Sequence, residues 1–215
     1  NIVSAAIDAK VKKVLALSTD KAVNPINLYG ATKLCAEKIF IDGNAISGKN
    51  STSFSIVRYG NVLSSRGSII PLIKKLKLEK QKTIPLTDER MTRFFINLTD
   101  AVKFVLSCFK MMDKGEIFIP KMPSIYIKDL MKTIYPEANI KIIGIRPGEK
   151  IDELLISKDE SLDTYIINNG YVLLPSKLYF NSKLKKKLKK FVKNFEYNSK
   201  DNVNFLSKNK IQGLL

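Results

Sequence analysis

Short apolar runs and longer segments of helical periodicity alternate along this chain. Residues 14–17 and 54–59 have the length and apolar content of buried strands. Between them, the pattern of residues 27–46 predicts a long helix that ends near Gly48. A strand, a crossover helix and a second strand predict a right-handed parallel unit, so an α/β fold with a parallel sheet is expected.

The rest of the chain continues this alternation. Helices are predicted at 68–80, 99–111 and 127–134, and extended segments at 84–86, 94–96, 115–120 and 140–145. Thr99 is the expected N-cap of the second of these helices. We therefore expect helices and strands to alternate along the whole chain.

Tyr29 and Lys33 are the first candidate chemical groups. Four residues apart on a helix, they project from the same face. A phenol ordinarily titrates near pH ~10, and a neighbouring ammonium helps it act as a base at neutral pH. Upstream, a hydroxyl, a carboxylate and an amine at residues 18–21 follow a predicted strand. The spacing favours a proton-transfer site; the alternative is a surface tyrosine beside solvated lysines.

Several ordered motifs resemble one enzyme family. The segment 17–37, LSTDKAVNPINLYGATKLCAE, resembles the extended short-chain dehydrogenase/reductases. Within them it is similar to the UDP-N-acetylglucosamine 4,6-dehydratases, in particular the C5-inverting enzymes of pseudaminic acid synthesis. Further matches follow in order at 58–62, 66–68, 91–94, 145–150 and 195–199. The resemblance covers nearly the whole chain.

The resemblance implies a Rossmann-like, doubly wound parallel sheet whose N-terminal half is missing, with a smaller α/β C-terminal lobe. It assigns residues 1–120 to the NAD(P)-binding domain with the catalytic motif. Residues 121–215 are assigned to the UDP-sugar-binding lobe and the C-terminal tail. The sequence contains no G-x-x-G-x-x-G turn to hold a pyrophosphate. We therefore expect the C-terminal part of a longer protein, inactive on its own.

The resemblance also implies a reaction and a cofactor, NADP or alternatively NAD. The C4 hydroxyl is oxidised, the C5 proton leaves, the C6 hydroxyl departs as water, and hydride returns to C6. Tyr29, aided by Lys33, would take the C4 hydroxyl proton, and both would contact the cofactor. Thr19 would hydrogen-bond the C4 oxygen. Lys21 would be the base at C5, and Asp20 the acid at C6.

Substrate contacts are implied at later motifs. Guanidinium groups bind phosphates in bidentate fashion, which favours arginine for the diphosphate. For Arg58, a structural ion pair is an equally open interpretation, and for Glu149 a solvated turn carboxylate is the alternative. Val62 would contact the nicotinamide. The candidate substrate-binding residues are Asn61, Arg66, Thr87, Arg93, Arg146 and Glu149.

Composition removes other classes of function. The net charge of +17 suggests a nucleic-acid partner, but lysine rather than arginine supplies most of the 37 basic residues. The lysine-rich run 183–193 has the pattern of an amphipathic helix. We expect no nucleic-acid or membrane partner. The absence of histidine argues against a catalytic zinc site. Cys35 and Cys108 are expected to be buried free thiols of a cytoplasmic protein.

The pair Asp20–Lys21 distinguishes the remaining hypotheses. Related sugar-nucleotide epimerases usually carry small hydroxyl residues there, and dTDP-glucose dehydratases carry Asp-Glu. The leading prediction is therefore a UDP-N-acetylglucosamine 4,6-dehydratase, a homo-oligomer when complete. The alternatives are a UDP-sugar C4 epimerase, an inactive UDP-sugar-binding protein, and a basic RNA-binding protein.

Overall fold

The computed structural model describes residues 1–48, 52–63, 65, 67–175, 188–190 and 195–213. They form two compact units that interleave along the chain. The first comprises Asn1–Tyr59, Val102–Lys121 and Leu154–Tyr197, and the second Gly60–Ala101, Met122–Glu153 and Asn198–Leu215. The units thus differ from the consecutive segments 1–120 and 121–215 that we expected. The chain passes between the units several times, and only the passage after Lys121 lies beside the expected boundary.

The first unit is built on a six-stranded sheet of order β1-β2-β6-β11-β10-β12. Strand β2 pairs in parallel with both β1 and β6, and β11, β10 and β12 extend the sheet in antiparallel fashion. The strands are β1 (Lys13–Thr19), β2 (Ser53–Tyr59), β6 (Ile117–Pro120), β10 (Thr164–Ile167), β11 (Gly170–Leu173) and β12 (Lys189–Lys190). The mixed α/β fold with a parallel sheet is confirmed.

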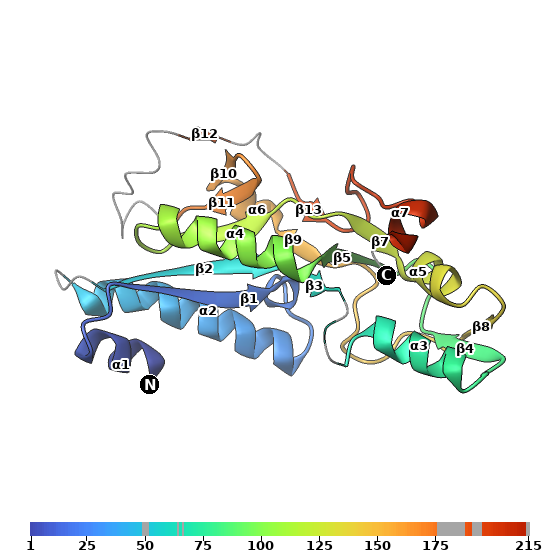
Figure 1. Cartoon of the computed structure of the whole chain (residues 1–215). Coiled ribbons are helices and arrows are strands. Elements are labelled where there is room, and N and C mark those ends of the chain that lie inside the picture. Colours follow the sequence, from blue (N-terminus) through green and yellow to red (C-terminus); the bar gives the residue numbers. More distant parts are fainter. Residues whose placement is uncertain (49–51, 64, 66, 176–187, 191–194, 214–215) are drawn as a thin grey trace. The chain divides into compact units, whose positions relative to one another are not determined.

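Helices lie on both faces of this sheet. In Figure 1, α1 (Ile2–Asp8) and α2 (Leu28–Ser47) lie on one side of β1 and β2, and α4 (Leu98–Met111) lies on the other. Successive residues of a strand point to opposite faces, so residues an odd number of positions apart lie on different faces. Accordingly, Phe54 packs against Val3, whereas Val57 belongs to the cluster that contains Phe104. The faces of β2 therefore bury separate apolar clusters, as in a doubly wound sheet.

The second unit is smaller. Its elements are β3 (Asn61–Val62), α3 (Ile69–Leu78), β4 (Thr83–Leu86), β5 (Thr92–Ile96), β7 (Ser124–Tyr126), α5 (Ile127–Ile134), β8 (Asn139–Ile142) and α7 (Lys208–Gln212). One sheet has the order β3-β5-β7, and β4 pairs in parallel with β8. Helices α3 and α5 share one apolar core, which includes the buried Ile73, Phe95 and Leu130. Several residues of this core also line a pocket.

Besides the 3-10 helix η1 (Asp20–Ala22), the described structure has three further short elements. They are the strand β9 (Leu154–Ile156), the helix α6 (Lys158–Ser161) and the strand β13 (Tyr197–Asn198), and β13 pairs with β9. The sequence analysis predicted none of these three elements. Among the described residues, no helix is both long enough and apolar enough to cross a bilayer.

Several details of the sequence-based prediction are corrected. Helix α4 begins at Leu98, and the Asn97 carboxamide accepts a hydrogen bond from the Asp100 amide at 2.7 Å, so Thr99 is not the N-cap. The extended segment 140–145 is shorter than predicted, because β8 ends at Ile142. Cys108 is buried as expected, but Cys35 is exposed on α2.

The predicted amphipathic helix at 183–193 is also not found where it can be checked. Lys189–Lys190 form strand β12, which pairs with β10. Residues 183–187 and 191–193 of that run lie outside the described residues. A strand at this point is inconsistent with one continuous helix.

Candidate functional site

The candidate proton-transfer groups of α2 lie near its start. Asn27 caps the helix by accepting a hydrogen bond from the Gly30 amide at 2.8 Å. The Tyr29 side chain is 56% exposed, and the Lys33 Nζ donates to the Leu17 carbonyl of β1 at 3.1 Å. The helix thus presents a phenol to solvent while its lysine is held against the end of the strand.

A glycine allows the helix to start so close to the strand tip. A Cβ at Gly30 would collide with the carbonyl oxygen of Lys21 and come within 2.9 Å of Pro25 Cβ. Because the carbonyl is backbone, it cannot rotate away as a side chain would. Gly30 therefore lets the first turn of α2 approach the 3-10 helix η1 (Asp20–Ala22) closely.

The tip of β1 carries a compact hydrogen-bonded cluster. The Thr19 hydroxyl donates to Asp20 Oδ1 at 2.8 Å, and the Lys21 ammonium donates to the same oxygen at 3.0 Å. Asp20 is fully buried, and no described residue donates a hydrogen bond to its Oδ2. One proton moved from Lys21 to Asp20 would produce a neutral amine and a protonated carboxyl. The pair can therefore supply a base and an acid at adjacent positions.

Behind this cluster lies a buried ion network. The Arg58 side chain is 1% exposed and holds the Glu37 carboxylate in bidentate fashion, with Nε–Oε1 at 3.0 Å and Nη2–Oε2 at 2.6 Å. It also donates to both carboxylate oxygens of Glu160 and to the Leu155 carbonyl. The Ser18 hydroxyl donates to Glu37 Oε1 at 2.5 Å. Arg58 is therefore a structural ion-pair residue, one of the two interpretations that its position had left open.

The network raises the pKa of Arg58 and lowers the pKa of Glu160. Burial by itself would lower the pKa of Arg58, but the hydrogen bonds and charges of Glu37 and Glu160 outweigh it and raise that pKa. Burial would likewise raise the pKa of Glu160, yet Arg58 and the capping contacts of Ser157 lower it. Both groups are consequently held in their charged forms.

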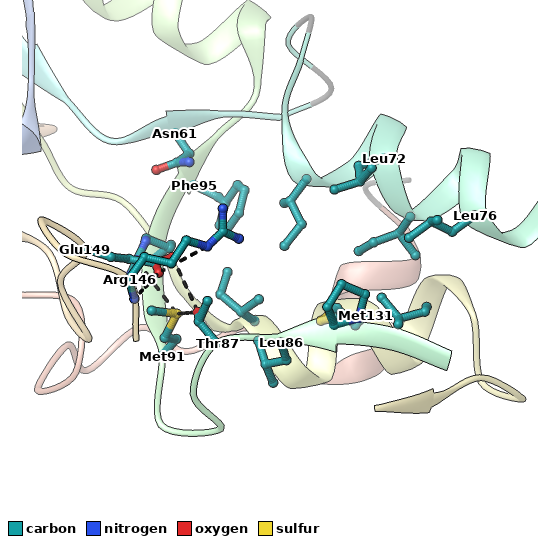
Figure 2. A pocket seen from close by; sticks show the side chains of 16 residues that line it. Asn61, Leu72, Leu76, Leu86, Thr87, Met91, Phe95, Met131, Arg146 and Glu149 are labelled. Atoms are coloured by element: carbon teal, nitrogen blue, oxygen red, sulfur yellow. Dashed lines mark hydrogen bonds and ion pairs between the residues drawn. The ribbon is translucent and has the colours of Figure 1, made fainter. Parts of the chain in front are cut away.

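A separate pocket lies within the second unit. Its volume is about 190 Å³, and α3, β4, β5 and α5 contribute to its wall. Figure 2 shows the apolar Leu72, Leu76 and Met131 on one side and the polar Thr87, Arg146 and Glu149 on the other. An apolar cleft with a few polar groups is the usual form of a small-molecule site.

The polar side of the pocket is hydrogen-bonded. The Thr87 hydroxyl is buried, lies 2.9 Å from Met91 Sδ, and donates to Glu149 Oε1 at 3.4 Å. Glu149 Oε2 lies 3.9 Å from Arg146 Nε, and the Arg146 side chain is 70% exposed. Glu149 is therefore more than a solvated turn carboxylate. The Asn61 Oδ1 is buried, and no described residue donates a hydrogen bond to it.

Arg93 lines the pocket, but its guanidinium also serves the fold. It donates to the backbone carbonyls of Thr92 and Ile151 at 2.7 Å and of Lys150 at 2.8 Å. Its Nε lies 3.5 Å from a Glu153 carboxylate oxygen, and both side chains are nearly buried. The phosphate role of Arg93 stays a prediction beside this structural one.

The candidate residues thus form two groups, each within its own unit. The first unit brings Thr19, Asp20 and Lys21 close to the start of the helix that carries Tyr29 and Lys33. The second unit gathers Asn61, Thr87, Arg93, Arg146 and Glu149 around the pocket, while Val62 lies in β3 and pairs with Ile96 of β5. Arg66 lies outside the described residues.

Sequence reasoning missed three members of the buried network, namely Ser18, Glu37 and Glu160. One signal was present for Glu37, which continues the four-residue spacing of Tyr29 and Lys33 along α2. No local pattern links Glu160 to Arg58, because 102 positions separate them.

Comparison with known proteins gives consistent relatives. A family described as polysaccharide biosynthesis protein matches residues 1–175. A UDP-N-acetylglucosamine 4,6-dehydratase (inverting) of Campylobacter jejuni is 54% identical over 176 residues, 82% of this chain and 53% of that protein. A UDP-glucose 4-epimerase of Rickettsia rickettsii is 44% identical over 165 residues, 74% of this chain and 48% of that protein. The chain spans about half the length of these curated relatives.

Solved structures agree with the sequence relatives. Pen from Bacillus thuringiensis superimposes with a TM-score of 0.87 at 36% identity, over 99% of this chain and 65% of that chain. A dTDP-glucose 4,6-dehydratase from Streptomyces venezuelae, solved with NAD and TYD, reaches a TM-score of 0.61 at 19% identity over 70% of this chain and 53% of that chain. The latter likeness concerns the fold alone. With its family match covering most of its length, the chain belongs to the polysaccharide biosynthesis protein family.

Proposed function

We propose that the full-length protein containing this chain is a UDP-N-acetylglucosamine 4,6-dehydratase that inverts C5. It would act in nucleotide-sugar synthesis for surface or flagellar glycans, with pseudaminic acid synthesis as the specific case. The observation that carries the proposal is the buried Asp20 paired with Lys21 beside the start of the helix that bears Tyr29 and Lys33. The 54% identity to the inverting dehydratase supports it.

A nicotinamide cofactor fits the residues present. The exposed Tyr29 phenol and the Lys33 ammonium share one helix face, a suitable pair of donors for a ribose. Val62 would add an apolar contact. The cofactor, NADP in our proposal and NAD as the alternative, would accept a hydride from C4 and later return it at C6.

The chain's own groups would move the protons. Tyr29, with Lys33 nearby, takes the proton of the C4 hydroxyl, and the Thr19 hydroxyl hydrogen-bonds the C4 oxygen. The resulting ketone makes the C5 proton acidic. Lys21, after passing its own proton to Asp20, takes the C5 proton, and Asp20 protonates the leaving C6 hydroxyl. When hydride returns to C6, C5 takes up a proton, and its delivery to the face opposite the one deprotonated inverts that carbon. The 3.0 Å contact between Lys21 and Asp20 is a suitable path for that first transfer.

The pocket of the second unit is the proposed site of the UDP group. Its apolar wall suits the faces of a base, and Thr87 and Glu149 offer hydrogen bonds to the uridine. The exposed Arg146 guanidinium is available to a diphosphate. The proposed substrate-binding set also includes Asn61, Arg93 and Arg66. We further propose that the full-length enzyme is a cytoplasmic homo-oligomer without nucleic-acid or membrane partners.

A UDP-sugar C4 epimerase is the second candidate, because epimerases occur among the relatives. Epimerisation needs only C4 oxidation and reduction, so it uses neither an acid at C6 nor a base at C5. Mass spectrometry separates the two activities, because only the dehydratase product is lighter by one water.

Lys21→Ala in the full-length protein tests the proposal. Oxidation at C4 should continue in part, whereas elimination should stop and C5 should no longer exchange hydrogen with deuterated water. Lys38→Ala, an exposed substitution further along α2, is the control and should exchange normally. Deuterium entering C5 at the normal rate in folded Lys21→Ala protein would move the base role elsewhere.

A further inference from the structure

We propose that Ser18 and Glu37 are positioning residues that hold the tip of β1 and the Tyr29–Lys33 face of α2 in one fixed register. The inference rests on the proposed function, because it takes Tyr29 and Lys33 as the proton-transfer pair. It adds two residues that touch neither substrate nor cofactor. They act through the groups that do.

Two bonds on successive helical turns join α2 to the strand. Tyr29, Lys33 and Glu37 follow one another at intervals of four, so they lie along one face of the helix. Lys33 Nζ donates to the Leu17 carbonyl at 3.1 Å, and the Ser18 hydroxyl donates to Glu37 at 2.5 Å. Consecutive strand residues thus bind consecutive turns. Two such points restrict both rotation of the helix and sliding along the strand.

Arg58 keeps the Glu37 carboxylate from turning. In the parallel pairing of β1 and β2, Ser18 lies beside Arg58. Glu37 accepts from Arg58 through both of its oxygens, and Oε1 also accepts from Ser18. All three side chains are buried. A carboxylate fixed by two bonds from a guanidinium has one orientation, so the Ser18 hydroxyl is held at one place.

Stability alone is a weak reason for this arrangement. A buried ion pair pays a desolvation cost that well-packed apolar residues avoid, so its contribution to folding is often small. Hydrogen bonds also fix the orientation of the side chains that they join, which apolar packing does not do. Ser18 immediately precedes Thr19 and Asp20, and a shift of about 1 Å in a catalytic group can lower a rate about 100-fold. The network is well placed to prevent such a shift.

Ser18→Ala in the full-length protein is the test, since it leaves both Arg58–Glu37 bonds in place. We expect kcat per folded molecule to fall about tenfold, while KM changes by less than about twofold. The isotope effect on kcat from deuterium at C4 should rise, because the C4 step becomes slower relative to the others. Ser18→Thr restores the hydroxyl and should recover most of the rate.

Ser55→Ala is the matched control. Ser55 is also a buried strand serine bound to a glutamate, with its hydroxyl donating to Glu116 at 2.7 Å. It lies on β2 three positions before Arg58, so it points to the opposite face of the sheet. The control should lower Tm about as much as Ser18→Ala, with kcat unchanged. Unchanged kcat in Ser18→Ala, or an equal loss in Ser55→Ala, would overturn the proposal.

A second readout separates this proposal from the dehydratase assignment, because it needs no substrate. The NOE contacts of the Thr19 methyl group report the position of the strand tip. They should change in Ser18→Ala, return in Ser18→Thr and stay unchanged in Ser55→Ala. Unchanged Thr19 methyl contacts in Ser18→Ala refute the positioning role. If the wild-type product has lost no water, the dehydratase assignment alone is refuted. The kcat values of the Ser18 and Ser55 variants are then measured for the epimerisation reaction.

Discussion

Arg58 is buried and Arg93 nearly so, yet their surroundings differ. Arg58, in the first unit, meets the carboxylates of Glu37 and Glu160. Arg93, in the second unit, meets mainly backbone carbonyls, with Glu153 at a longer 3.5 Å. The carboxylates around Arg58 fix the orientation of its guanidinium. The guanidinium of Arg93 instead joins the chain segments whose carbonyls it binds. The first region is therefore organised for the orientation of groups, and the second for the shape of a pocket.

The expected consequence is a division of mutational effects. Substitutions in the β1–α2 region should act on rate, because its groups are the candidate proton-transfer residues. Substitutions around the pocket should act on folding when the side chain is internal and on ligand binding when it is exposed.

Arg93→Ala should have the largest effect. Removal of the guanidinium takes one hydrogen-bond donor from each of three carbonyls and one cation from beside the nearly buried Glu153, so the free energy of unfolding should fall by about 3–5 kcal/mol. Urea denaturation measures it, with Arg146→Ala as the exposed control. A fully stable Arg93→Ala protein that cannot bind UDP would show that the main task of Arg93 is ligand contact.

Tyr29→Phe should follow. The substitution removes only a hydroxyl from an exposed ring, so folding should be unaffected while kcat falls at least ~100-fold, the usual scale for a general base. Initial rates of the full-length protein measure the loss. Tyr126→Phe, another exposed tyrosine, is the control. Near-normal turnover would remove Tyr29 from the mechanism and the β1–α2 region from the chemistry.

Arg146→Ala should have a moderate effect confined to binding. Its side chain is 70% exposed, so the Tm should stay the same. The Kd for UDP should rise about tenfold, as expected for the loss of one charge-assisted contact. Calorimetry with UDP measures it, and Arg90→Ala is a suitable exposed control. An unchanged Kd would place the diphosphate away from Arg146.

The acid sensitivity of the Arg58 network should be the smallest effect. The folded protein binds the Glu160 proton less tightly than the unfolded chain, since Arg58 lowers the Glu160 pKa. Its stabilising contribution is therefore complete above the unfolded pKa of about 4.5 and is lost as pH falls through the lower folded pKa. Glu160→Gln should flatten the acid side of the stability curve measured in urea. An unaltered slope would mean that the pair is not coupled to folding.

The sequence by itself determined what depends on near neighbours. The strand–helix–strand order, the shared face of Tyr29 and Lys33, and the cluster from Thr19 to Lys21 all follow from spacings of one to four residues. Backbone periodicity defines such relations before any packing occurs. For the same reason, α5 was predicted with its observed bounds.

Only the tertiary structure decided the roles of the arginines. Arg58 meets Glu37 across 21 positions and Glu160 across 102, and Arg93 meets the carbonyl of Ile151 across 58. No periodic pattern relates positions so far apart, because their contact depends on which strands pair and where each loop returns. A buried cation must find its partners wherever the fold brings them, and that requirement separated the internal Arg58 and Arg93 from the exposed Arg146.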